Sequence, residues 1–303
     1  MSELHAIFGL DFPAYLHGPA LVGALMGFGL VVGVLTGLFG VGGGFLITPL
    51  LNVGFGIPYE LAIGSSLSFT IGTASSGMSR HMRLRNFEPR STVILAATSI
   101  LGAVAGASGN QSLRAHLGPY RYTLTMDALF VALLGLTAWL VWRGSDRHRS
   151  GRSPLQRFPL PPRVSLPAAN LNDVSLPGLC LVGLCIGLTA GMMGVGGGVL
   201  FMPLLILVVG LTPHQAVGTS LGTVVFSATA GTISYGLSGN VNLWIVMALL
   251  VASVIGVQIG AWLCHRLRAD RLRRCLALVT GLTALAVLVR LACSILSGPG
   301  GGK

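Results

Sequence analysis

Apolar residues form long blocks along the chain, separated by short polar segments that carry almost all of the charge. The blocks cover about 19–39, 45–56, 60–79, 91–109 and 122–142 in the first half, and about 177–193, 199–210, 214–235, 243–263 and 273–296 in the second. Most have the length of about 20 residues that a helix needs to cross a bilayer, but the second block of each half has only about 12. The pattern predicts an all-α, polytopic transmembrane bundle.

A glycine-rich segment interrupts the first apolar stretch. It reads GLFGVGGGFLITPLL from Gly37 to Leu51. One interior glycine costs a helix up to about 1 kcal/mol relative to alanine, so four glycines within five positions predict a local break. Backbone freed at this depth must be packed in protein or line an aqueous cavity, because lipid offers it no hydrogen bonds.

The same segment occurs twice. GMMGVGGGVLFMPLL starts at Gly191, 154 residues after Gly37, and at the same offset AIGSSL (62–67) aligns with AVGTSL (216–221). A register kept over about fifty residues indicates a duplicated module. The predicted division is an N-terminal segment 1–18, membrane repeat 1 at 19–143, a linker at 144–176, membrane repeat 2 at 177–297 and a tail at 298–303.

Basic residues occupy different loops in the two halves. The loop after the third block is basic in the first half (Arg80 to Arg90) and uncharged in the second, whereas the loop after the fourth block is strongly basic only in the second half (264–274). Positively charged loops stay in the cytoplasm, so the two halves are predicted to be inverted repeats with a cytoplasmic linker and extracytoplasmic termini. Inversion requires an odd number of crossings per half. The first two blocks therefore either both cross, which gives ten spans, or dip in and out as a re-entrant pair.

Composition supports an integral membrane protein. The mean hydropathy is +0.80 and only 9% of the 303 residues are charged, too few to cover a soluble surface. The net charge of +11 sits in segments that flank apolar blocks, so it reflects membrane topology better than nucleic-acid binding. The five cysteines form no Cys-x-x-Cys pair, and no metal or cofactor is expected.

The broken helices predict an anion site. A helix that restarts after a break presents unpaired amides and a positive end, and two such ends meeting near the midplane are typical of transporters built from inverted repeats. Hydroxyl groups on the following helices can donate to an oxyanion without placing a charge in the membrane. The predicted substrate-binding residues are Gly40, Gly42, Gly43, Gly44, Ser65, Ser66, Gly194, Gly196, Gly197, Gly198, Thr219 and Ser220. Close helix packing by the glycines and interhelical hydrogen bonding by the hydroxyls are the structural alternatives.

Ionisable or strongly polar residues other than hydroxyls are few within the apolar blocks. Asp127, His214, Gln258 and Arg290 lie near block ends or are isolated along the sequence. Among them His214 is the candidate for a proton-linked group, because histidine changes its charge near neutral pH. A solvated histidine at the membrane boundary is the alternative interpretation.

Other functions were weighed on the same residues. Gly218 to Gly222 fits the G-x-S-x-G pattern of a serine hydrolase, but that motif needs a strand-to-helix turn and the surrounding sequence is helical. Gly40 to Gly44 lacks the Lys-Ser/Thr ending of a nucleotide loop. An enzyme is therefore not expected, and a passive anion channel is the main alternative to a carrier.

The paired motifs resemble those of the sulfite exporter TauE/SafE family, also called the toluene sulfonate uptake permease family. The resemblance rests on G-x-x-G-x-G-G-G-x-x-x-x-P-x-L at Gly37 to Leu51 and Gly191 to Leu205, followed by AIGSSL and AVGTSL. It implies a polytopic inner-membrane permease that moves sulfite, sulfonates or related sulfur oxyanions as a secondary carrier. The partners implied are the small anion and the lipid bilayer; the anion itself, the direction of transport and the oligomeric state stay open.

Overall fold

A computed structural model describes residues 19–84, 86–143, 154–157, 161–169 and 171–297. The segments predicted at 1–18 and 298–303, and part of the linker, lie outside these ranges. Repeat 1 consists of α2 (Pro19–Phe39), α3 (Gly44–Phe55), α4 (Tyr59–Arg83), α5 (Pro89–His116) and α6 (Pro119–Arg143). Repeat 2 consists of α8 (Leu176–Met193), α9 (Gly198–Leu204), the π-helical turn η4 (Leu205–Val209), α10 (Pro213–Gly236), α11 (Leu243–Arg266) and α12 (Ala269–Ser297). The predicted helical bundle is confirmed, with helix ends within a few residues of most apolar blocks.

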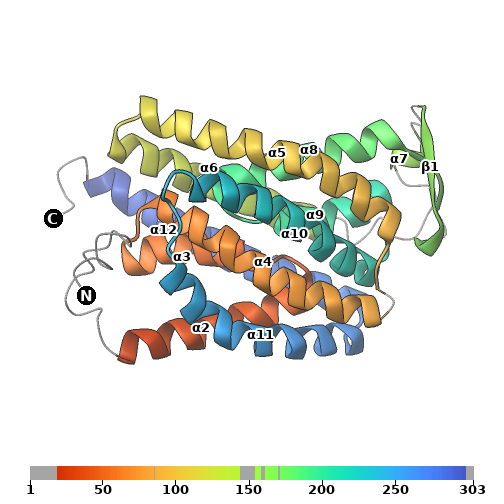
Figure 1. Ribbon diagram of the computed structural model, residues 1–303, viewed down its shortest axis with the longest axis horizontal. Helices are drawn as coiled ribbons and strands as arrows, with labels where there is room; N and C mark the ends of the chain where they lie inside the picture. Colours follow the sequence, from red (N-terminus) through yellow and green to blue (C-terminus); the bar gives the residue numbers. More distant parts are fainter. Residues whose placement is uncertain (1–18, 85, 144–153, 158–160, 170, 298–303) are drawn as a thin grey trace.

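The two repeats are inverted in space. Helices α4 and α10 occupy the same place in their repeats and pack side by side. Gly77 near the end of α4 faces Leu221 near the start of α10, and Gly231 near the end of α10 faces Leu67 of α4. The two helices therefore run antiparallel. The start of α2 and the end of α12 lie on one side of the bundle, and β1 and α7 lie on the other, which we call the linker side (Figure 1).

Each repeat packs its first helix against the other repeat. Helix α2 lies along α11, and α8 lies along α5 in the equivalent way. The contacts are backbone to backbone: Gly29, Gly33 and Gly37 face Leu249, Ser253 and Val257, and Gly183, Gly187 and Gly191 face Leu95, Ser99 and Ala103. Glycines allow the two backbones to approach closely. The van der Waals contact that results is one of the interactions that hold helices together in lipid. Neither repeat can therefore form its native packing alone.

Helices α2 and α3 form a re-entrant pair. Near the end of α2, the Gly37 carbonyl lies 3.0 Å from the ring of His81 on α4, and the glycine turn that follows lies beside Thr70 and Thr73 in the middle of α4. From the glycine turn α3 runs back toward the start of α4, and its 12 residues span only about 18 Å. The same arrangement holds for α8 and α9–η4. A second arm this short is what the re-entrant topology, one of the two left open by the sequence, requires.

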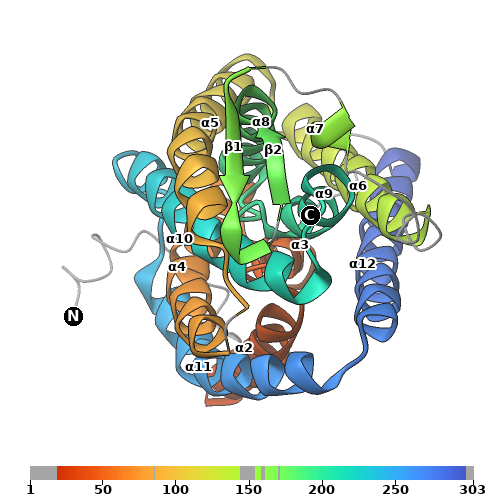
Figure 2. The same cartoon turned by 90° about the vertical axis from the view of Figure 1, so that its right-hand side faces the viewer.

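The linker contains a β-hairpin that the sequence did not predict. After the short helix α7 (Pro154–Arg157), strands β1 (Arg163–Leu166) and β2 (Leu171–Ser175) pair antiparallel across the turn η3 (Pro167–Ala169). The Arg90 side chain at the start of α5 donates to the Ser165 carbonyl at 3.2 Å. Figure 2 shows the hairpin across the linker-side end of the bundle, in front of α5 and α8. The strands have only four and five residues and lie in a proline-rich segment, so the sequence pattern did not indicate them.

The outer surface matches a membrane environment. Large apolar side chains point outward from the peripheral helices, including Val93 (68% exposed) on α5 and Leu282 (66%) on α12. An aqueous surface rarely carries such a continuous apolar cover. Among the described helices, α5, α6, α8, α10, α11 and α12 are long and apolar enough to cross a bilayer. The chain is a multi-pass membrane protein.

The contact between α2 and α11 predicts a specific cost for one methyl group. A Cβ at Gly33 would overlap the Ser253 backbone, whereas a Cβ at Gly27 on the same helix has no neighbour within 4 Å. We expect Gly33→Ala to lower the free energy of unfolding by about 1–3 kcal/mol through overpacking. Gly27→Ala should be neutral or slightly stabilising. Thermal unfolding of both purified variants in one detergent checks this; equal melting temperatures would contradict the packing described.

Candidate functional site

Two glycine turns lie in the interior, one in each repeat. Gly40, Gly42 and Gly43 have φ of 71°, 79° and 89°, and their counterparts Gly194, Gly196 and Gly197 have 71°, 69° and 82°. Residues with a side chain rarely adopt these left-handed angles, so the glycines are needed to turn the chain between the two arms of each re-entrant pair. The predicted breaks are confirmed in both halves.

The two turns touch each other. A Cβ at Gly44 would overlap the backbone of Gly194 and Val195, and a Cβ at Gly198 would overlap the backbone of Val41. Gly44 and Gly198 therefore serve the close approach of one turn to the other. The structure thus brings all eight predicted glycines together in one place.

The turns leave amide groups without protein partners. In the part of the chain that the structure describes, the backbone hydrogen bonds outside the helices include none donated by Gly42, Gly43 or their counterparts Gly196 and Gly197. The next residue in each turn begins α3 or α9, where an amide has no partner within its helix. Unpaired amides and the positive helix end make each turn attractive to an anion.

Ser66 and Ser220 bind the turn of the opposite repeat. The Ser66 hydroxyl donates to the Gly194 carbonyl at 2.7 Å, and the Ser220 hydroxyl donates to the Gly40 carbonyl. Thr48 lies 2.6 Å from the Ser66 hydroxyl oxygen and also donates to Gly194 at 3.3 Å. In this conformation both serines hold the turns in place through their hydroxyl protons.

Ser65 and Thr219 have a different set of contacts. Their hydroxyl oxygens accept from the amides of Asn242 at 2.9 Å and Glu88 at 3.1 Å, the capping residues of α11 and α5. Both side chains are buried. The pair thus joins the hydroxyl-rich helix of each repeat to the next helix of the other repeat, one residue away from the serines that contact the turns.

Two further threonines at the turn of repeat 1 have no partner. Thr70 lies between the turns, with its methyl group next to the Cβ positions of both Gly42 and Gly196, and Thr36 lies next to Gly43. Both are fully buried, and neither hydroxyl has a hydrogen-bond partner among the described residues. An unsatisfied buried hydroxyl is costly, so these groups point to a bound polar species.

Sequence reasoning did not single out Thr36 and Thr70. Thr70 was one of many hydroxyls on its helix, and Thr36 belongs to a block that looked uniformly apolar. Their counterparts under the repeat are Ala190 and Val224, so the two turns differ in the side chains around them. A comparison of equivalent positions in the two halves could therefore have identified Thr36 and Thr70 from the sequence.

His214 lies away from the turns. It is the second residue of α10, at the linker side, half-buried and with its ring nitrogen 3.2 Å from the Cys264 carbonyl. His81, near the linker-side end of α4, holds the Gly37 carbonyl, and its counterpart Tyr235 holds Gly191 at 3.0 Å. Among the described histidines, His81 is therefore the one with a hydrogen-bond contact to a glycine motif.

Two residues that looked isolated in the sequence are neighbours. Asp127 on α6 and Arg290 on α12 pair across the two repeats, with 3.8 Å between the guanidinium and a carboxylate oxygen. They are isolated along the sequence, but α6 packs against α12 and so brings together two positions that are 163 residues apart.

The serine-hydrolase alternative finds no support in the geometry around Ser220. Ser220 lies inside α10, so the strand-to-helix elbow is missing, and its hydroxyl donates to a backbone carbonyl. Among the described residues, no group of three or more His, Cys, Asp or Glu side chains could hold a metal ion.

The serine contacts predict unequal effects of two equivalent substitutions. Ser220→Ala leaves the buried Gly40 carbonyl without its hydroxyl donor, which costs about 1–3 kcal/mol. Ser66→Ala should cost less, because Thr48 still donates to Gly194. Thermal unfolding of the two variants tests the order, and adding Thr48→Val to Ser66→Ala should remove the difference. A larger loss for Ser66→Ala alone would refute this account.

The fold and the site together define a class of protein. A membrane protein built from two inverted repeats, whose broken helices meet in the interior, has the architecture of a transporter. The profile described as sulfite exporter TauE/SafE matches residues 25–287. The chain belongs to this family of membrane transporters.

Curated relatives agree with this assignment. A probable membrane transporter protein of Xylella fastidiosa (strain Temecula1) is 29% identical over 269 residues, which cover 87% of this chain and 92% of the relative. The probable membrane transporter protein YjnA of Bacillus subtilis is 31% identical over 84% of this chain and 96% of its own length. MJ0441 of Methanocaldococcus jannaschii, with the same description, is 23% identical over 93% of this chain and its own full length. No solved structure matches the chain.

Proposed function

We propose that this membrane transporter is a secondary carrier of small sulfur-containing anions, such as sulfite or organosulfonates, and that it is coupled to protons. The observation that carries the proposal is the pair of touching glycine turns, which bring together amides from both repeats that have no hydrogen-bond partner among the described residues. Amide donors suit oxyanions, and their fixed positions avoid the cost of a full charge in the membrane.

The substrate site in this proposal consists of the glycine turns and the hydroxyls around them. The amides of Gly42 to Gly44 and Gly196 to Gly198 bind the anionic oxygens, with Ser66 and Ser220 as neighbouring donors once the turns separate. Thr36 and Thr70 add two donors that have no other partner in this conformation. The family name supports sulfite and related anions as the substrate class.

The proposed membrane is the inner membrane, with the linker side in the cytoplasm. Arg80 and Arg83 at the end of α4 and Arg266 at the end of α11 lie on the linker side, together with Arg90. This clustering of basic residues supports the orientation. The start of α2 and the end of α12 then face the extracytoplasmic side.

A passive anion channel is the alternative that shares this site. In proteoliposomes, accumulation of a non-titrating sulfonate against its electrochemical gradient, driven by an imposed pH gradient, requires a carrier. Flux that only follows the anion gradient would favour the channel.

The glycine turns give a direct test of the proposed site. Gly43→Val and Gly197→Val place a branched side chain at left-handed φ, and even a Cβ at Gly43 would approach Val32 within 2.6 Å. We expect each to reduce sulfite or sulfonate transport more than tenfold, about 1.4 kcal/mol or more in barrier height. Gly135→Val, at an exposed position on α6 with no neighbour within 4 Å, is the matched control. Normal transport by correctly inserted Gly43→Val and Gly197→Val would refute the site.

Thr70 tests the contribution of an unpaired hydroxyl. Thr70→Val removes the hydroxyl with little change of shape, so apparent substrate affinity should fall about 5- to 100-fold, or about 1–3 kcal/mol. Thr70→Ser should retain most of the affinity. Thr229→Val is the control, because that hydroxyl donates to the Val225 carbonyl of its own helix. Anion-dependent thermal stabilisation measures the affinity; an unchanged Thr70→Val would exclude this hydroxyl from the site.

A further inference from the structure

A buried polar cluster joins four helices on the side opposite the linker. The Tyr59 hydroxyl of α4 donates to the Asp127 carboxylate of α6, and the same carboxylate oxygen lies 3.8 Å from the Arg290 guanidinium of α12. Arg290 also donates to the side-chain oxygen of Asn52 on α3. The cluster thus connects α6 and α12, the last helices of the two repeats, to the short arm of a re-entrant pair.

Asp127 retains an oxygen without a partner. Its side chain is fully buried, and the second carboxylate oxygen has no hydrogen bond within the described part of the chain. Asp127 is the ninth residue of α6, about 12 Å along the helix from its start, so the carboxylate lies within the membrane. Buried carboxylates at such depth are expensive and mark functional positions.

Few ionisable groups surround this carboxylate. Tyr59 and Arg290 contact it directly. Tyr122 on α6 and the ion pair of Arg114 on α5 with Glu60 on α4, at 2.7 Å, are the next groups along these helices. Helix α9, which also packs on α6, has no ionisable side chain. The net charge at Asp127 is therefore set mainly by its own proton and by Arg290.

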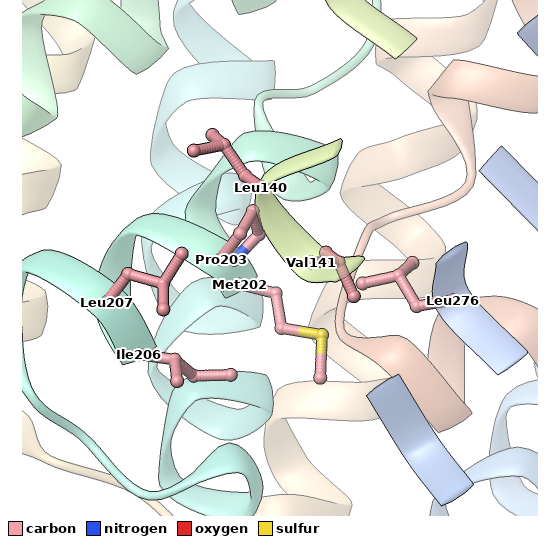
Figure 3. A pocket seen from close by; sticks show the side chains of 7 residues that line it. All are labelled: Leu140, Val141, Met202, Pro203, Ile206, Leu207 and Leu276. Atoms are coloured by element: carbon pink, nitrogen blue, oxygen red, sulfur yellow. The ribbon is translucent and has the colours of Figure 1, made fainter. Parts of the chain in front are cut away.

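The equivalent place in repeat 2 has no such cluster. The counterparts of Asn52, Tyr59, Asp127 and Arg290 are Ile206, Pro213, Gly281 and Leu136. There the short arm lines an apolar pocket, in which Ile206 and Met202 lie with Leu140, Val141 and Leu276 (Figure 3). Packing between a short arm and α6–α12 needs no polar group, so the cluster in repeat 1 has another role.

From these contacts we propose that Asp127 and Arg290 form a coupled binding site for one proton and one small oxyanion. In this structure the carboxylate and the guanidinium compensate each other. When a proton from the aqueous phase binds the free carboxylate oxygen, Asp127 becomes neutral and the half-buried guanidinium of Arg290 loses its counter-charge. A monoanion at Arg290 restores the balance, so each ligand favours the binding of the other.

The position of the cluster links it to the glycine turn. Asn52 follows Thr48 by four residues, so one face of α3 contacts Arg290 at one end and Ser66 and Gly194 at the other. If Arg290 binds an anion in place of Asp127, its hydrogen bond to Asn52 transmits the change to α3, the short arm that follows the glycine turn. The inference rests on the proposed function for the identity of the anion and places the proton at Asp127 instead of His214.

Transport with the non-titrating anion methanesulfonate tests the coupling in proteoliposomes. A gradient of about one pH unit should drive up to about tenfold accumulation by the wild-type protein, with one proton per anion. Asp127→Asn should still exchange methanesulfonate but show no accumulation and no proton movement, and Asp127→Glu should restore both. Asp173→Asn, an exposed aspartate in the linker hairpin, is the matched control. The proposal is overturned if the Asp127→Asn variant accumulates methanesulfonate with proton movement as the wild-type protein does. It is also overturned if the His214→Gln variant loses this coupling while Asp127→Asn keeps it.

Infrared difference spectra provide a readout that needs no substrate. When the pH is lowered, wild-type protein should gain the carbonyl-stretch band of a protonated carboxylic acid as Asp127 takes up a proton. The band should be absent in Asp127→Asn and present in Asp173→Asn. A band that persists in Asp127→Asn overturns the proton site. If the band behaves as expected while no sulfur anion is transported, the proposed function fails and the proton site is supported.

Discussion

The structure depends on satisfying backbone groups that are freed inside a membrane protein. Each glycine turn interrupts a helix where lipid would leave every exposed carbonyl and amide unpaired at a cost of several kcal/mol. Hydroxyl groups solve the problem for the carbonyls: Ser66 and Ser220 bind the turn of the opposite repeat, and Thr73 and Ser227 bind Gly42 and Gly196 of their own repeat. Among the described residues, no group accepts a hydrogen bond from the amides of Gly42, Gly43, Gly196 or Gly197 in the same way. The turn carbonyls are therefore paired and these amides are not, which favours an anion as the ligand of the interior.

The same interactions make the two repeats depend on each other. Serines of one repeat hold the turn of the other, and the first helix of each repeat packs along the fourth helix of its partner through glycine contacts. A movement of one turn must therefore alter contacts made by the other repeat. In a carrier, this connection allows one interior site to respond to both sides of the membrane.

The sequence predicted the scaffold well because its signals were local or repeated. Apolar block length gave the helices, and the offset of 154 residues gave the duplication. Reversed charges in the loops correctly indicated inversion. Contacts across the repeats could not be read this way: Asp127 and Arg290 are 163 residues apart, and Thr48 was hidden in an apolar block. The β-hairpin was missed because its strands are short and lie among prolines.

The two halves share a backbone but differ in chemistry. The positions of Thr36, Thr70, Asp127 and Arg290 are occupied in the other half by Ala190, Val224, Gly281 and Leu136. Equivalent backbone turns preserve the symmetry that an inverted repeat needs in order to open toward either side. The unpaired hydroxyls of Thr36 and Thr70 both belong to repeat 1, whereas the charged pair takes Asp127 from repeat 1 and Arg290 from repeat 2. Duplicating the charged pair would place a second costly ion pair in the membrane without giving the anion a second role.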